Sequence, residues 1–283
     1  MQTIRPAAVA GLFYPDAPGA LGSAVRAYLA QAMPRGEPPP ALPKAMIVPH
    51  AGYVYSGPVA ASAYARLAAG RSTIRRVVLL GPVHRVPIRG LALPAAQAFA
   101  TPLGTVEVDA AAAAEALRLP QVRTSEAAHA LEHSLEVQLP FLQTALDAFR
   151  IVPFAVGDAS ASEVAAVIDR LWGGPETLIL LSSDLSHYHP YDQARAIDRG
   201  TGEEILALTA ALDHEQACGA TPINGFAVCA RQHGLAPELL DLRNSGDTAG
   251  DKLRVVGYAA FAFNKRPAAG APRSVAAVEE AVA

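Results

Sequence analysis

The 283-residue chain carries a formal net charge of −3, its charges of both signs are interspersed, and 51% of its residues are hydrophobic. Its apolar runs fall short of the roughly 20 residues that a membrane helix needs, and its first residues lack the charged-then-apolar pattern of a secretion signal. The composition therefore argues against nucleic-acid and membrane partners, and predicts a cytoplasmic protein with a large core and two reduced cysteines.

The predicted elements alternate between helix and strand. A helix over 18–32 leads through a Pro-rich connector to a strand that begins at Ala45, and Pro58 is well placed to open a helix over 59–69. With the strand that ends near Gly81, this forms a unit typical of parallel strand pairs. The later elements are helices over 109–117, 132–148 and 191–212, a helix capped by Ser160 or Ser162, and strands over 90–94, 105–108, 149–157, 177–183, 239–242 and 253–263.

This order predicts an α/β fold in one domain over residues 1–264. We expect a central, mostly parallel or mixed sheet with helices on both faces. The tail over 265–283 is rich in Pro, Ala and Gly, and we expect it to be disordered.

Three of the apolar segments end abruptly in a turn that carries histidine. Ligands of open α/β sheets bind outside the carboxyl ends of the strands. Three such strands therefore bring His50, His84 and His187 toward one edge, together with Asp184, and predict a metal or acid–base site there. The segments are residues 45–50, 77–84 and 178–187.

His50 and His84 hold matching positions directly after a strand. Either residue alone fits equally well as a surface-loop histidine or a hydrogen-bonded core histidine. Two equivalent placements favour a pair of metal ligands, although their 34-residue spacing carries no zinc-finger signature.

Residues 182–189 form the richest polar segment. Asp184 can pair with His187 and fix the tautomer of its imidazole. Ser182, Ser183 or Asp184 can alternatively cap a helical turn, which is a common role for these residue types. The chain lacks a Gly-x-Ser-x-Gly elbow, and this weakens a serine-hydrolase interpretation.

For the remaining polar residues, a purely structural role is at least as well supported by the sequence as a functional one. His133 and Glu136 lie three apart on the helix expected from residue 132, and spacing alone favours a solvated first turn for them. Cys218 and Cys229 read as small core residues. Asn224 and the segment 244–247 read as turns, with Asp247 and Asp251 as weak candidates for oxygen ligands.

Taken together, these segments resemble the Memo family, also called the AmmeMemoRadiSam system protein B family. The likeness runs in order along the chain to about residue 263. The matching stretches include residues 5–6, 11–15, 49–57, 80–84, 132–140, 182–187, 244–247 and 256–260.

The resemblance implies a fold similar to that of the class III extradiol dioxygenases, which use non-haem Fe(II) held by two histidines and a carboxylate. It implies that His50 and His84 bind the metal. His133 and His187 would line the pocket, with His187 in an acid–base role, and Asp184 would either orient a neighbouring side chain or bind the metal itself. The pocket is expected to include Tyr53, Glu136 and Thr248.

The third ligand is the point at which this chain departs from the family. Animal members are similar here but place a cysteine near the C-terminal strand, where this chain has Thr248. Asp247 or water is then expected to complete the site. Imidazole with carboxylate favours Fe(II), with Zn(II) as an alternative, and softer ligands favour Cu.

Three functions are consistent with this resemblance. The first is an iron-dependent, dioxygenase-like oxidoreductase acting on a small molecule. The second is a non-catalytic metal- or ligand-binding protein that acts with AMMECR1-like and radical S-adenosylmethionine partner proteins. The third is metal-dependent hydrolysis by zinc-bound water.

Overall fold

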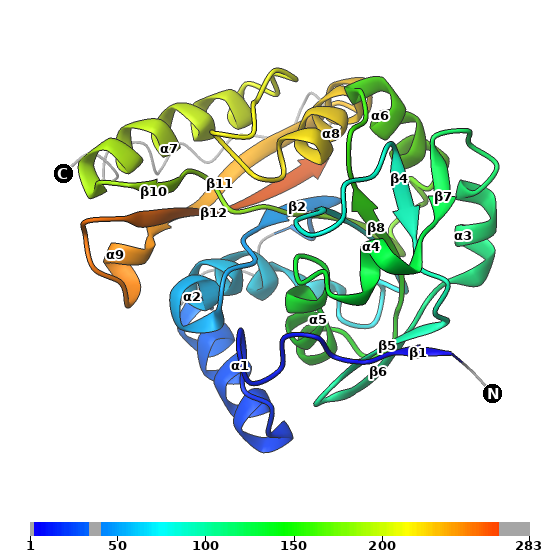
Figure 1. Cartoon of the computed structure of the whole chain (residues 1–283), viewed down its shortest axis with the longest axis horizontal. Helices are drawn as coiled ribbons and strands as arrows, with labels where there is room; N and C mark the ends of the chain where they lie inside the picture. The colour runs from blue at the N-terminus through cyan, green and yellow to red at the C-terminus, as the bar shows by residue number, and fades with distance from the viewer. Residues whose placement is uncertain (1–2, 34–40, 266–283) are drawn as a thin grey trace.

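A computed structural model describes residues 3–33 and 41–265 (Figure 1). Most of the Pro-rich connector, and all of the predicted tail except residue 265, lie outside these residues. The helices are α1 Pro18–Ala32, α2 Tyr53–Tyr64, α3 Ala110–Ala116, α4 Glu126–Ala130, α5 Leu139–Ala145, α6 Ala161–Arg170, α7 Tyr191–Leu206, α8 Ala220–Gln232 and α9 Ser245–Thr248, with 3₁₀ helices η1 Ala65–Gly70 and η2 Glu136–Gln138. The strands are β1 Ile4–Arg5, β2 Ala45–Val48, β3 Arg76–Pro82, β4 Leu91–Leu93, β5 Ala98–Thr101, β6 Gly104–Glu107, β7 Val122–Thr124, β8 Arg150–Val156, β9 Thr177–Ser182, β10 His187–His189, β11 Leu235–Asn244 and β12 Val255–Lys265.

The main sheet is mixed, with a parallel centre. Its strands follow the order β10-β12-β2-β9-β3-β8-β4-β7, and β11 pairs with β12. The pairs β2–β9, β9–β3 and β3–β8 are parallel, whereas β12 joins β2 antiparallel and β4 joins β8 antiparallel. A smaller sheet contains β1, β5 and β6. The predicted α/β class and mixed sheet are confirmed.

Both faces of the sheet are buried, so its central strands contain continuous apolar runs. In β2, Ala45 and Ile47 face one core cluster, and Met46 and Val48 face the other. This alternation follows from the two-residue period of a strand. Parallel strands covered on both faces read as continuous apolar runs, and that is why the three histidine-tipped segments were visible in the sequence.

Helices cover the two faces separately. Figure 1 shows α1, α2 and α5 on one side of the sheet and α6, α7 and α8 on the other. Within the described residues, no helix combines the length and the apolar character required to cross a membrane.

Two predicted helices differ from the observed ones. The expected helix over 132–148 is broken into a turn, η2 and α5, and Pro140 lies in the first turn of α5, where its missing N–H is tolerated. The helix after His50 begins at Tyr53, so Pro58 lies inside it instead of opening it. Pro58 leaves the carbonyl of Val54 without a helical partner, and this is tolerated because Val54 is exposed.

A third difference concerns residues 220–232. Asn224 was expected in a turn but lies inside α8, a helix that the sequence pattern did not indicate. Its side chain accepts a hydrogen bond from the amide of Leu212 and donates one to the carbonyl of the same residue. The amide therefore ties α8 to the segment that precedes it. The preceding helix, α7, ends at Leu206, short of the expected residue 212.

Candidate metal site

The site lies at the carboxyl ends of three adjacent parallel strands. Val48 of β2 pairs with Ser182 of β9, and β9 runs parallel to β3 on its other side. His50, Asp184 and His84 each follow the last residue of one of these strands by two positions. Neighbouring parallel strands thus deliver the three side chains to one edge, as the sequence predicts.

Three imidazoles converge at this edge. His50, His84 and His133 each offer a ring nitrogen, and these nitrogens all lie within 4.8 Å of one another. The ring centroids are 5.2 Å apart for His50 and His84, 5.3 Å for His50 and His133, and 4.6 Å for His84 and His133. His133 comes from the turn before η2, so the break in the expected helix brings this ring to the cluster.

Glu132 orients His84. One carboxylate oxygen accepts from the backbone N–H of His84 at 2.7 Å, and the other lies 2.9 Å from Nδ1 of the same ring. Since a carboxylate can only accept, Nδ1 carries the proton and Nε2 is left with a free lone pair. Burial raises the pKa of Glu132, but hydrogen bonds from His84 and Ser134 outweigh this and lower it to about 2. The carboxylate is therefore ionised at neutral pH.

The tautomer of His50 follows from a chain of hydrogen bonds. The hydroxyl of Ser182 donates its proton to the carbonyl of Ser134 at 2.6 Å and accepts from the amide of Gln138 at 2.9 Å. Its contact of 2.8 Å with Nδ1 of His50 is therefore one in which the ring donates. The lone pair of His50 lies on Nε2, as a metal ligand requires.

Burial keeps the rings of His50 and His133 neutral. It lowers the pKa of His50 well below its ordinary value, with further lowering from the neighbouring histidines, and it lowers the pKa of His133 to about 4. Nδ1 of His133 is buried and has no hydrogen-bond partner among the described residues. His50 is buried, His133 is partly buried and His84 is exposed toward the pocket, and neutral imidazoles are the form in which histidine binds metals, so these residues fit a divalent cation.

Asp184 lies beside this cluster. Its Oδ1 accepts from the backbone N–H groups of His50 and Ala51, at 2.7 and 3.3 Å, and its Oδ2 lies 3.9 Å from Nε2 of His50. The sequence allowed an Asp184–His187 pair, but no hydrogen bond or ion pair joins the two residues. Burial raises the pKa of Asp184 to about 7 despite the two amide donors. This carboxyl group can therefore exchange a proton near neutral pH.

An open pocket of about 500 Å³ gives access to the cluster. Its lining includes His84, Cys218 and His214, with Val83 and Ile88 among its apolar residues. Cys218 was expected in the core, but its sulfur lies 3.4 Å from Nε2 of His50, at the edge of the site. Cys229 is a buried core residue, as predicted.

Comparison with known proteins identifies the family to which this chain belongs. A family model described as "Memo-like protein" matches residues 5–262. The chain belongs to the Memo family. It is 38% identical to the MEMO1 family protein MK0963 of Methanopyrus kandleri over 92% of this chain and 99% of that protein, and 37% identical to a MEMO1 family protein of Aquifex aeolicus over the same shares.

In this Memo family member, Asp247 is not among the residues whose ligand atoms cluster at the site. The carboxylate of Asp247 accepts from the hydroxyl of Tyr191 at 2.5 Å and from the backbone N–H of Asn244 at 3.0 Å. Thr248 belongs to the short helix α9, and its hydroxyl donates to the carbonyl of Ser245. The structure therefore places His133, and not Asp247, beside His50 and His84.

The other residues expected at the pocket of this Memo protein have structural contacts of their own. The hydroxyl of Tyr53 donates to the carbonyl of Val137, which fixes α2 against η2. His187 lies in β10, paired with β12, and burial lowers its pKa. Glu136 is fully buried, and its carboxylate faces the N-terminal segment instead of solvent. The expected solvated turn at Glu136 is thus wrong, because the break before η2 directs this side chain inward.

Arg5 holds the segment that carries His133 in this Memo protein. Its guanidinium donates to the carboxylate of Glu136 at 2.6 Å and to the carbonyls of His129 and Glu132, at 2.7 and 2.6 Å. Tyr14 also donates to Glu136. Sequence reasoning missed the roles of Glu132, Ser182 and Arg5, since each depends on a partner distant in the chain. The one local signal was the position of Glu132 directly before His133.

Proposed function

We propose that this chain is a metal-dependent oxidoreductase that binds one divalent cation, Fe(II) in the first instance, through His50, His84 and His133. The observation that carries the proposal is the pair of hydrogen bonds that place the lone pairs of His50 and His84 on Nε2. Partners that fix the tautomer of a ligating histidine are typical of metal sites. Imidazoles with a carboxylate close by favour Fe(II) or Zn(II).

The side chains around the cluster have separate roles in this proposal. Glu132 and Ser182 position the ligands, and the pocket beside His84 admits a small molecule with an apolar part. Asp184 holds or releases a proton at the oxygen that faces His50, and His187 is the second proton-transfer group. The bound iron would supply the redox chemistry, by analogy with the extradiol dioxygenases that the family resembles.

Elemental analysis of anaerobically purified protein tests the metal site. We expect about one metal ion per chain, lost in His50→Ala, His84→Ala and His133→Ala. The matched control is His233→Ala, because His233 is paired with Asp169 on the surface and stacked on Trp172. Full occupancy in the three cluster variants would refute the ligand assignment.

Oxygen consumption tests the reaction. The protein is loaded with Fe(II) under anaerobic conditions, and O₂ uptake is then measured with a panel of catechols. Uptake that needs both iron and a catechol, and that is lost in His84→Ala, would support the dioxygenase-like reaction. Stoichiometric metal without uptake for any catechol would exclude ring cleavage.

One observation favours metal-dependent hydrolysis as a second candidate. The cluster itself consists of three histidines without a carboxylate, and three histidines with an open position form one of the known catalytic zinc sets. Zinc found at one equivalent, with ester hydrolysis that a chelator abolishes, would select this reaction. Metal binding without turnover in either assay would favour the non-catalytic role, which co-purification with AMMECR1-like and radical S-adenosylmethionine proteins would test.

A further inference from the structure

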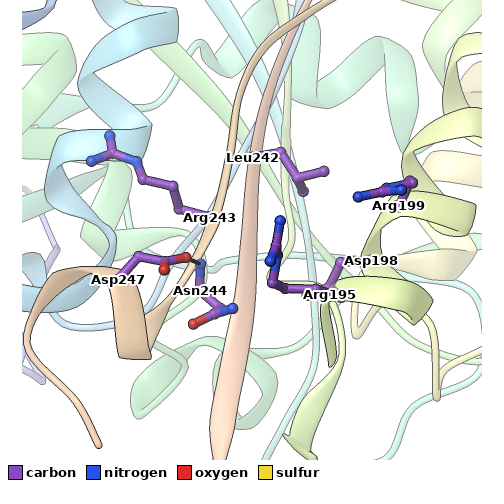
Figure 2. Close-up of a pocket in the computed structure, with 7 residues that line it drawn as sticks. All are labelled: Arg195, Asp198, Arg199, Leu242, Arg243, Asn244 and Asp247. Carbon is purple, nitrogen blue, oxygen red and sulfur yellow. Dashed lines mark hydrogen bonds between the residues drawn. The ribbon is translucent and has the colours of Figure 1, made fainter. Parts of the chain in front are cut away.

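A second, smaller pocket lies between α7 and β11, on residues that the proposed reaction does not use. Figure 2 shows Arg195 and Arg199 reaching from α7 toward Leu242 of β11, with Asn244 below them. Its volume is about 90 Å³. This volume is larger than a single water molecule needs. It is far smaller than a cofactor pocket, which has a volume of about 300–1,000 Å³. The space fits a small ion or one chemical group.

Two cationic side chains of this pocket have no anionic partner. Arg195 and Arg199 are four residues apart, so they lie on the same face of α7. Within residues 3–33 and 41–265, neither guanidinium forms an ion pair or a hydrogen bond. Arg195 packs only over the ring of Tyr191, at 5.7 Å from its centre. Two guanidinium groups without partners at a concave surface favour an anion.

Asn244 adds a buried donor. The residue is 1% exposed, and its side-chain oxygen accepts from the backbone N–H of Gly246 at 2.9 Å. Its Nδ2 group has no partner among the described residues. Figure 2 shows this nitrogen turned toward the side of the pocket on which Arg195 lies. A buried N–H group without an acceptor destabilises the folded protein. A ligand that offers an acceptor at this point would remove that penalty.

Asp198 gives the pocket its selectivity. The residue is 2% exposed, and its Oδ1 accepts from the backbone N–H of Ser186 at 3.0 Å. The carboxylate packs directly against Gly257, on the strand beside Asn244, where a Cβ atom would collide with Oδ2. Asp247 also lines the pocket, and its carboxylate already accepts from Tyr191 and from the backbone N–H of Asn244. An anion that binds here must therefore tolerate carboxyl groups, as an anion carrying its own proton does by donating to Asp198.

We propose that this pocket binds a phosphate group, either inorganic phosphate or the head of a phosphate monoester. Arg195, Arg199 and Asn244 donate to its oxygens, and Asp198 accepts from a P–OH group. Inorganic phosphate always keeps a P–OH group at neutral pH, because it has a third ionisation far above pH 7, whereas a monoester, with a second pKa of about 6, keeps this proton only in part. Sulfate has no such proton, so Asp198 disfavours it.

Calorimetric titration of the full-length protein with inorganic phosphate at pH 7 tests the site. We expect one phosphate per chain, a Kd at least 10-fold weaker in Arg195→Gln and in Arg199→Gln, and sulfate binding at least 10-fold weaker than phosphate binding. Arg170→Gln is the matched control, since it removes the same charge from an exposed position on α6 and should leave the Kd unchanged.

Two further variants test the donor and the selectivity. Asn244→Asp keeps the oxygen that bonds to Gly246 and replaces the amide donor, and it should weaken phosphate binding at least 10-fold. Asp198→Asn should remove the preference for phosphate over sulfate. A monoester such as glycerol phosphate that binds at least 10-fold tighter than inorganic phosphate would identify an organic phosphate as the ligand, and equal or weaker binding would identify the free ion.

Three results would overturn the proposal. The first is the absence of saturable phosphate binding. The second is binding that is unchanged in the two α7 arginine variants, which would place phosphate elsewhere, for example at the histidine cluster. The third is an equal loss of phosphate affinity in Arg170→Gln, which would show that the effect arises from the net charge of the protein and not from the pocket. All three are independent of the metal site, because no variant alters His50, His84 or His133.

Discussion

Replacing Glu132 by Gln removes the carboxylate that orients the metal cluster. In the folded protein this group receives hydrogen bonds from the backbone N–H and the ring of His84 and from the backbone N–H of Ser134. Its pKa falls from 4.5 to about 2 on folding. That difference corresponds to about 3 kcal/mol of stability at neutral pH.

The pH dependence gives the sign of the effect. A depressed pKa in the folded state stabilises the protein above pH 4.5, and this contribution is lost as the pH falls toward 2. Urea denaturation of metal-free protein should show that the destabilisation caused by Glu132→Gln is at least about 3 kcal/mol at pH 7 and about 2 kcal/mol smaller at pH 3. Metal affinity should also fall 10–100-fold, as measured by competition with a chelator.

Glu126→Gln is the control for this substitution. Glu126 is an exposed carboxylate on the neighbouring helix α4, and its replacement should change the stability by no more than about 0.5 kcal/mol. An equal loss of stability at pH 7 and pH 3 for Glu132→Gln would refute the assignment, because it would show that the ionised form contributes nothing.

Three further substitutions test the supports of the site. Ser182→Ala should weaken metal binding about 10–100-fold in the same chelator competition, because the tautomer of His50 is no longer fixed; unchanged affinity would contradict the hydrogen-bond argument. Gly81→Ala places a methyl group 2.7 Å from a serine oxygen and should cost about 1–3 kcal/mol in urea denaturation, and a neutral effect would mean that the site is loosely packed. Arg5→Met should cost about 3–5 kcal/mol in the same assay, since Glu136 is left buried and charged, and Arg5→Met with Glu136→Gln should recover part of that loss.

Much of the sheet could be predicted because its strands are buried on both faces. The segments before His50, His84 and Asp184 contain continuous apolar runs, and parallel strands end at the same edge. The placement of two histidines and a carboxylate at that edge therefore follows from the sequence pattern alone. The likeness to the Memo family led to the same residues.

The rest of the site depends on contacts that no local pattern records. His133 reaches the cluster because the chain turns before η2, and this turn is held by Arg5, more than a hundred residues earlier. Helical spacing placed His133 and Glu136 on one face, whereas the turn sends them in opposite directions. Cys218 looks like a core residue in sequence, and only the hydrogen bonds from the backbone N–H groups of residues 218 and 219 to Asp184 and Ser183 bring its sulfur to His50.

β12, the last strand among the described residues, pairs with β2 near the start of the chain. Residues 45–47 of β2, which leads to His50, pair with residues 261–263 of β12. The strand that leads to His50 therefore gains its second neighbour only when a segment more than 200 residues later in the chain pairs with it. An edge of the sheet that carries the histidine cluster thus depends on one of the longest-range pairings of the fold, and any change that weakens β12 should loosen the position of His50.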